Sequence, residues 1–238
     1  MRQAMIQHGL HCRESDLYTI KRVLDGKAFE YKGLDLGPGD VLLDLGAHIG
    51  TSVKYALDRG VDHVIAVEML PDTISLLRRN FGQHPQVTIV PAAVAGENAP
   101  DVLATRLFRN PMGASVSTWN SKARTSSLVP TVPITGLLHG YRPNKVKFDI
   151  ENSEYDVITP YAQVLWNAGI ERIAGEMHTA SAATCEMARE LSEALQTVGY
   201  QTNKPVSGYP TEKFTWNYHA AWWRPDVLGD CHFVEGDQ

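Results

Sequence analysis

The sequence predicts an α/β fold in which helices flank a doubly wound, mostly parallel β-sheet, and three observations support this prediction. The apolar run "VLLDL" at 41–45 is short and bounded, which is typical of a strand buried on both faces. The chain then alternates between helix-like and strand-like segments, as right-handed βαβ units do. A glycine-containing turn, "GAHIG" at 46–50, follows the first of these strands, at the place where doubly wound sheets bind ligands.

Residues 1–39 are expected to form a helical preface to the sheet. In the segment "SDLYTIKRVLDG", Ser15 or Asp16 can cap a helix whose apolar side chains recur at helical spacing. Gly26 is expected to end this helix, because glycine readily adopts the backbone conformation that follows a helix.

Residues 40–238 are expected to form one Rossmann-like domain with an insert. Its first half alternates between predicted helices at 51–60 and 72–82 and predicted strands at 63–68 and 86–94. Periodicity then fades at 96–144, which is rich in Pro, Ser and Gly and is expected to be a loop insert with one or two short strands around 129–134. The alternation returns with strands at 145–150, 170–177 and 217–223 and helices at about 154–166 and 182–198.

Composition and charge restrict the partners of the chain. A formal net charge of -5 gives no general attraction to polyanions, so no nucleic-acid partner is expected. The three cysteines lie far apart and lack C-x-x-C spacing, which argues against a disulfide framework or a structural zinc site and favours a reducing compartment. The N-terminal stretch has no apolar h-region, so no leader segment is expected, and no long uncharged apolar run occurs in the sequence. We therefore expect a cytoplasmic protein without a membrane partner; homo-oligomer formation stays open.

The turn after the first strand favours a cationic cofactor over a dinucleotide. A dinucleotide-binding turn would read G-x-G-x-x-G, whereas Gly46 and Gly50 here have the spacing G-x-x-x-G and follow an acid, Asp44. An acid at this position would repel a diphosphate but would attract a ligand that carries an ammonium and a sulfonium group. S-adenosylmethionine is such a ligand.

The end of the second strand strengthens this interpretation. Glu68 ends "HVIAVE", where a carboxylate can accept hydrogen bonds from both hydroxyls of a ribose. A glycine in this turn and an acid at a strand end each occur alone in many doubly wound folds. Their order and spacing in this chain point more specifically to S-adenosylmethionine. The expected cofactor-binding residues lie in the turn and at three strand ends. They are Asp44, Gly46, Ala47, His48, Gly50, Thr51, Glu68, Met69 and Asp149.

The candidate catalytic residues follow two later strands. Asp149, Glu151 and Glu154 come after one strand, and Glu176 and His178 end the next, so parallel pairing would bring them to one rim. Carboxylates this close repel one another, so at least one pKa should rise or a cation should bind between them. The expected catalytic residues are His178, Asp149 and Glu151. His178, with an unperturbed pKa near ~6.5, is the expected proton acceptor, and no metal ligand is predicted.

Several of these carboxylates also have simpler interpretations. Asp149 could contact only the methionine part of the cofactor, Glu154 could be an acid favoured at a helix N-terminus, and Glu176 could pair with Lys147 or Arg172. In the insert, Trp119, Lys122 and Arg124 could fold over an acceptor as a lid or belong to a solvated segment.

In these residues the sequence resembles the class I S-adenosylmethionine-dependent methyltransferases, and more narrowly the FkbM family. The narrower resemblance rests on "KFDIENSE", which resembles the family pattern Lys-x-Asp-x-Glu-Gly-x-Glu over 147–154. It extends to "DLGAHIG", Glu68, Asn80, "GAS" at 113–115 and "VPITGLL" at 132–138, and it covers roughly residues 40–180. Asn152 stands where the family usually has glycine, although asparagine tolerates a positive φ better than most residues.

The resemblance implies a seven-stranded sheet of the class I methyltransferase fold, S-adenosylmethionine as cofactor and O-methylation of a hydroxyl on a small molecule such as a sugar or secondary metabolite. Two other functions stay open at this point. One is a nucleotide-dependent oxidoreductase that uses a variant glycine turn, and the other is a non-catalytic module that keeps the cofactor-binding fold.

Overall fold

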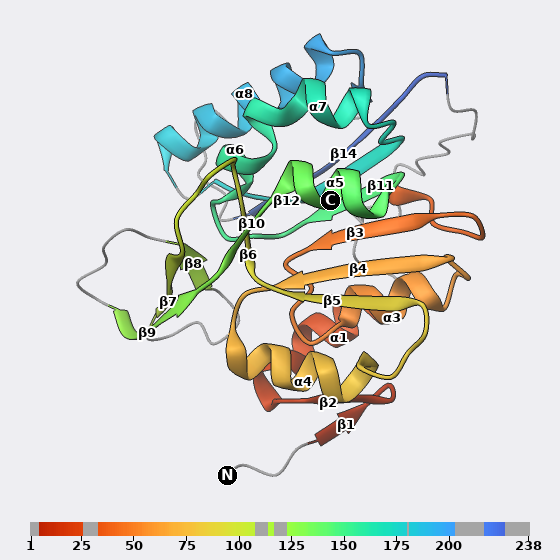
Figure 1. Cartoon of the computed structure of the whole chain (residues 1–238), viewed down its shortest axis with the longest axis vertical. Coiled ribbons are helices and arrows are strands. Elements are labelled where there is room, and N and C mark those ends of the chain that lie inside the picture. The colour runs from red at the N-terminus through yellow and green to blue at the C-terminus, as the bar shows by residue number, and fades with distance from the viewer. Residues whose placement is uncertain are drawn as a thin grey trace.

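The computed structural model describes residues 5–25, 33–107, 114–116, 123–179, 181–202 and 217–226. Its centre is a seven-stranded sheet with the strand order β13-β14-β12-β11-β3-β4-β5 (Figure 1). The strands are β3 (Val41–Leu45), β4 (His63–Glu68), β5 (Val87–Pro91), β11 (Lys145–Phe148), β12 (Arg172–His178), β13 (Gln201–Thr202) and β14 (Asn217–Trp223). The five strands from β12 to β5 pair in parallel, and β14 pairs antiparallel with both neighbours. The predicted doubly wound, mostly parallel sheet is therefore confirmed.

Helices cover both faces of the sheet, as Figure 1 shows. They are α1 (Leu17–Leu24), α3 (Thr51–Leu57), α4 (Pro71–Phe81), α5 (Ile134–Tyr141), α6 (Glu154–Val157), α7 (Ala162–Asn167) and α8 (Ala182–Thr197), with short 3-10 turns at Glu14–Asp16 and Thr159–Tyr161. Successive side chains of a strand point to opposite faces. Accordingly, Leu43 and Leu45 pack in the core under α5, α7 and α8, whereas Leu42 packs in the core under α1, α3 and α4.

The N-terminal segment contains a hairpin that the sequence prediction did not include. Strands β1 (Met5–Gln7) and β2 (Leu10–Cys12) pair antiparallel ahead of α1. His8 and Gly9 connect them with φ values of 50° and 80°, the conformation that a two-residue hairpin turn requires. Each strand has only three residues, which is too short for a periodic pattern in the sequence.

The insert contains more regular structure than the expected one or two short strands. Strands β7 (Val102–Leu107), β8 (Ala114–Val116) and β9 (Ala123–Val129) form a separate antiparallel sheet. Strand β6 (Ala93–Ala95) pairs in parallel with β10 (Thr131–Pro133), and α5 follows directly. Of the expected lid residues, Arg124 belongs to β9, while Trp119 and Lys122 lie outside the described residues.

Within the described ranges, the structure contains no helix that is both long enough and apolar enough to cross a membrane.

Candidate active site

A cavity of about 220 Å³ lies at the carboxyl ends of the central strands. Gly46, Glu68, Asp149 and Glu176 line it from the ends of β3, β4, β11 and β12. This is the position in which open parallel sheets bind ligands, because neighbouring strand ends there bring residues from distant parts of the chain to one rim.

The glycine turn depends on the absence of side chains at two positions. Gly46 has a φ of 82°, and a Cβ atom there would collide with the backbone oxygen of Asp149. Gly50 has a φ of 94°, and a Cβ atom there would collide with the ring of Phe81 on α4. Gly46 therefore lets the turn approach the end of β11, and Gly50 lets α3 pack closely on α4.

The structure places Asp44 beneath the turn rather than on the cavity wall. Its side chain is fully buried, accepts a hydrogen bond from the Ser52 hydroxyl and lies 3.1 Å from Lys147 Nζ. Lys147 also donates a 2.8 Å hydrogen bond to the carbonyl oxygen of Gly46. Asp44 thus fixes the turn through Lys147, and its charge is already compensated.

Glu68 lies on the cavity wall with both carboxylate oxygens held. Oε2 accepts a 3.0 Å hydrogen bond from the backbone N–H of His48, and Oε1 accepts a 2.8 Å bond from that of Leu70. Burial raises the pKa of this carboxyl group, and the backbone hydrogen bonds oppose the rise. A carboxylate has about four acceptor positions, so Glu68 retains capacity to accept a further hydrogen bond from a diol.

Thr51 supplies an independent sign that the cavity accommodates a polar ligand. Its side chain lines the cavity and is 3% exposed. In the described part of the chain, its hydroxyl oxygen has no hydrogen-bond partner. Since a buried hydroxyl without a partner costs free energy, a bound ligand with a polar group at this point would remove that cost. Ala47, His48 and Met69 also line the cavity, whereas Gly50 does not.

His48 connects the turn to the N-terminal segment. Its backbone has a φ of 54°, and its Nε2 lies 2.8 Å from a guanidinium nitrogen of Arg13. Burial lowers the pKa of His48 to about 4, so the ring is neutral at pH 7 and can accept a hydrogen bond from Arg13.

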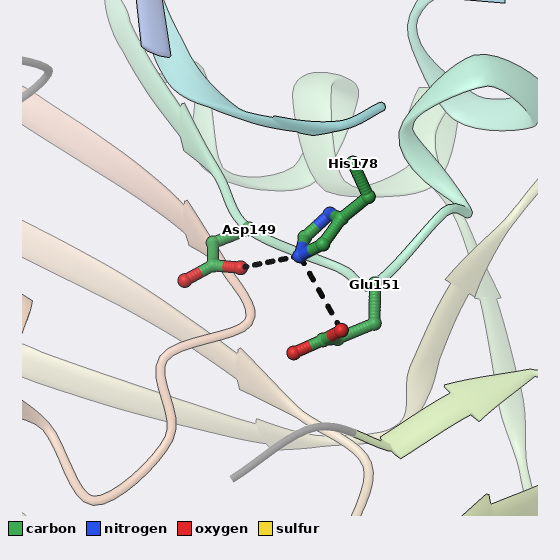
Figure 2. A group of neighbouring side chains, drawn as sticks. All are labelled: Asp149, Glu151 and His178. Atoms are coloured by element: carbon green, nitrogen blue, oxygen red, sulfur yellow. Dashed lines mark ion pairs between the residues drawn. The ribbon is translucent and has the colours of Figure 1, made fainter. Parts of the chain in front are cut away.

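The expected catalytic residues come together beside the cavity (Figure 2): Asp149 and Glu151 line it, and both face the ring of His178, which is not among the lining residues. Nδ1 of His178 lies 3.1 Å from Oε1 of Glu154, and that oxygen also accepts a 2.9 Å hydrogen bond from the backbone N–H of His178. The other ring nitrogen, Nε2, lies 3.3 Å from Glu151 Oε2, 4.0 Å from Asp149 Oδ1 and 3.9 Å from Glu176 Oε1. Four carboxylates therefore surround one imidazole.

The protonation of His178 differs from the sequence expectation. Burial alone would lower the pKa of this imidazole, but the hydrogen bond to Glu154 and the charges of Glu154, Glu151 and Asp149 raise it to about 10. The ring is therefore a cation at neutral pH in this arrangement and is not available to accept a proton. The expectation of a pKa near ~6.5 fails because these carboxylates stabilise the charged ring.

Glu151 differs from a surface carboxylate in its backbone conformation and in its pKa. Its pKa is raised to about 7, chiefly by burial; His178 opposes the rise, and the charges of Asp149 and Glu154 contribute to it. Glu151 and Asn152 have φ values of 53° and 74°, in the left-handed region that non-glycine residues seldom occupy. Asn152 thus adopts the positive φ that the glycine usual at this position in the family would allow. The loop keeps Glu151 on the cavity wall.

The remaining charged groups near the cavity also form ion pairs. Lys147 pairs with Asp44, and Arg172 pairs with Asp35. Glu176 Oε2 lies 3.7 Å from both Arg22 and His219.

One wall of the cavity was missed by the sequence prediction. Tyr18, Thr19 and Arg22 of α1 line the cavity, and Arg22 also contacts His219 at 2.9 Å. A polar face on a helix usually indicates solvent exposure, and no local pattern shows that this face meets the strand ends.

A family of sequences and several solved structures are similar to this chain. The sequence model of the methyltransferase FkbM domain matches residues 44–202. The structure is similar to precorrin-6Y C5,15-methyltransferase from Geobacter metallireducens, with a TM-score of 0.47 and 15% identity over 93% of this chain and 94% of that chain. It is also similar to Aeropyrum pernix fibrillarin in complex with S-adenosylmethionine, with a TM-score of 0.47 and 12% identity over 93% of this chain and 81% of that chain. Comparison with curated proteins gives no significant match.

The strand order and the family match define a class I S-adenosylmethionine-dependent methyltransferase. The family match spans more than half of the chain, and the chain belongs to the FkbM methyltransferase domain family. Its cofactor is S-adenosylmethionine, and the buried Thr51 hydroxyl and the remaining acceptor capacity of Glu68 fit a polar ligand of this kind. The alternatives of a nucleotide-dependent oxidoreductase and of a non-catalytic module are set aside.

Proposed function

We propose that this methyltransferase methylates a hydroxyl group of a small molecule such as a sugar or a secondary metabolite. The observation that carries the proposal is the set of polar side chains on the cavity wall. Glu68 and Thr51 lie on its wall near the glycine turn, and Asp149 and Glu151 lie on its wall near His178. A cofactor and a hydroxylated acceptor would each meet polar groups there.

Glu68 is proposed to accept hydrogen bonds from the ribose hydroxyls, and Thr51 to contact a second polar group of the cofactor. Ala47, His48 and Met69 would complete this part of the cavity wall. Gly46 and Gly50 are assigned to the close packing of the turn, and Asp44 to its attachment to Lys147. Asp149 lines the cavity and would face the cationic methionine part of the cofactor.

When bound, S-adenosylmethionine supplies a methyl group whose bond to sulfur breaks with the electron pair staying on sulfur. The chain must then hold the acceptor oxygen in line and remove its proton as the new C–O bond forms. We assign the proton to a carboxylate oxygen of Glu151, because this residue lines the cavity and His178 already faces carboxylates through both ring nitrogens. His178 would hold Glu151 and Asp149 in place.

The test is methyl transfer from isotopically labelled S-adenosylmethionine to a panel of sugars and polyhydroxylated metabolites, with an RNA mixture as a separate arm. Mass spectrometry of the products identifies the methylated atom. The proposal predicts an O-methylated small molecule, and Glu151→Gln should slow its formation about 100-fold or more if a positioned base is lost. Glu186→Gln on the exposed side of α8 is the matched control. Methylation of RNA alone, or of nitrogen or carbon alone, would contradict the proposal.

A further inference from the structure

We propose that Asp149, Glu151 and His178 bind a divalent metal cation beside the cavity, where the methyl acceptor is proposed to bind. One ligand atom from each of these residues lies within 4.8 Å of the other two. Figure 2 shows the two carboxylates facing the same ring nitrogen of His178. Because the three residues come from the turn after β11 and the end of β12, the sheet itself brings the ligands together.

The histidine is oriented as a metal ligand requires. Oε1 of Glu154 lies 3.1 Å from Nδ1 and so leaves Nε2 to face Asp149 and Glu151. A divalent cation at Nε2 would replace the proton that these carboxylates otherwise stabilise there. Metal-binding histidines commonly use their second nitrogen in this way, with a carboxylate that fixes the tautomer and the ring orientation. Glu154 is thus proposed as a positioning residue behind the ligand set.

A separate observation is a buried carboxylate oxygen with no hydrogen bond. Glu154 is fully buried, and among the described residues its Oε2 has no hydrogen-bond partner. The ion pairs of Glu154, Glu151 and Asp149 in this part of the structure all go to one imidazole. Even a protonated imidazole would leave the negative charge of these three carboxylates in excess, and a divalent cation would compensate it.

The ligand set selects the kind of cation. Carboxylate oxygens suit Mg²⁺, Ca²⁺ and Mn²⁺, whereas an imidazole nitrogen suits transition metals, so Mn²⁺ fits two carboxylates and one histidine best. Three protein ligands would leave coordination positions for an acceptor oxygen.

This role rests on the proposed function. The cation would polarise the acceptor hydroxyl, and Glu151 could bind it through one oxygen and take the hydroxyl proton on the other.

The experiment measures Mn²⁺ binding to the full chain after treatment with a chelator, by electron paramagnetic resonance and calorimetry. The expected result is one Mn²⁺ per chain with a dissociation constant below about 1 mM. Glu151→Gln and Asp149→Asn should each weaken binding about tenfold or more, and Glu186→Gln should bind as the wild type does. Thermal unfolding of each variant verifies that it folds. Absence of Mn²⁺ binding, or equal binding by all variants, would overturn the proposal.

Methyl transfer is measured separately, so the two proposals can fail independently. Methyl transfer that persists in chelator, together with absent Mn²⁺ binding, overturns the metal site and leaves the O-methyltransferase proposal standing. Mn²⁺ binding that depends on Glu151 and Asp149, together with no O-methylated product, supports the metal site and contradicts the proposed function.

Discussion

Glu68 shows how a single strand-end residue can be prepared for a ligand. Two backbone N–H groups, from His48 and Leu70, fix its carboxylate before anything binds. A fixed acceptor loses little conformational freedom on binding, which favours affinity. The same bonds tie the conformation of the glycine turn to that of Glu68.

Glu68→Ala should therefore weaken binding of S-adenosylhomocysteine by about 1–3 kcal/mol, because charge-assisted hydrogen bonds to the ribose would be lost. Calorimetry of the variant beside Glu186→Ala, an exposed acid on α8, measures the difference. An affinity equal to that of the wild type would remove Glu68 from this role.

His48 predicts a dependence of stability on pH. Its pKa falls from 6.5 to about 4 on folding, chiefly through burial, although nearby Asp16 opposes the fall. Above pH 6.5 the ring is neutral in both states. As the pH falls toward 4, the unfolded chain binds the proton first, so the free energy of unfolding decreases by up to about 3 kcal/mol.

Denaturant unfolding at pH 7 and at pH 4 tests this prediction. His48→Asn cannot ionise, and asparagine tolerates the φ of 54°, so this variant should lose less stability on acidification than the wild type. The exposed His139→Asn is the control. If the free energy of unfolding of the wild type and of His48→Asn had the same pH dependence, His48 would not contribute to the loss of stability in acid.

At the scale of elements, the turn between β3 and α3 is held from two sides. Its first glycine touches the end of β11, and the backbone N–H groups of Gly46 and Ala47 donate to the carbonyl oxygen of Val67 on β4. A displacement of the turn would therefore disturb Glu68 and Asp149 together.

Gly46→Ala should destabilise the fold by about 1–3 kcal/mol and also weaken cofactor binding, because a Cβ atom would collide with the Asp149 carbonyl at a φ of 82°. Gly140→Ala is a suitable control, since a Cβ atom there meets nothing within 4 Å. Denaturant unfolding and calorimetry measure both effects. Equal stability of the two variants would show that the turn can move without cost.

The segment before α1 is a second support of the cofactor turn. Arg13 contacts His48 at 2.8 Å, Asp16 at 3.0 Å and Asp72 of α4 at 3.2 Å. Because Asp16 is fully buried, this network connects the N-terminal segment to the cavity wall through fixed groups.

Arg13→Gln should weaken binding of S-adenosylhomocysteine by about 1 kcal/mol, or roughly fivefold, since His48 and its turn lose a charged hydrogen-bond donor. Arg78→Gln on the exposed side of α4 is the control. Calorimetry that finds the same affinity for both variants would limit the network to a structural role.

At the scale of the whole molecule, the sheet could be predicted because its central strands are short, apolar-rich segments that alternate with helical patterns. The segments predicted as strands at 41–45, 63–68 and 145–150 correspond to β3, β4 and β11, and the helices between them followed from their spacing. The hairpin β1–β2 and the sheet β8-β7-β9 could not be predicted in the same way. Their strands are short, irregular or far apart in sequence, and pairing between chain segments decides whether they form.

The residue types of the site could be predicted from the sequence, but its ion pairs and pKa values could not. The register pairs Asp44 with Lys147, and this ion pair places Asp44 beneath the turn. The pKa of His178 is raised because α6 places Glu154 beside it, although the two residues lie 24 positions apart in the chain. Such electrostatic effects depend on three-dimensional neighbours, which residue spacing in one sequence does not specify.

The central claim is that the cavity at the carboxyl ends of the sheet binds S-adenosylmethionine beside the His178 cluster. Calorimetric titration of the full chain with S-adenosylhomocysteine tests it most directly, because the product needs no acceptor and does not react. We predict saturable binding of one molecule per chain with a micromolar dissociation constant. No binding at high micromolar concentration would contradict the claim.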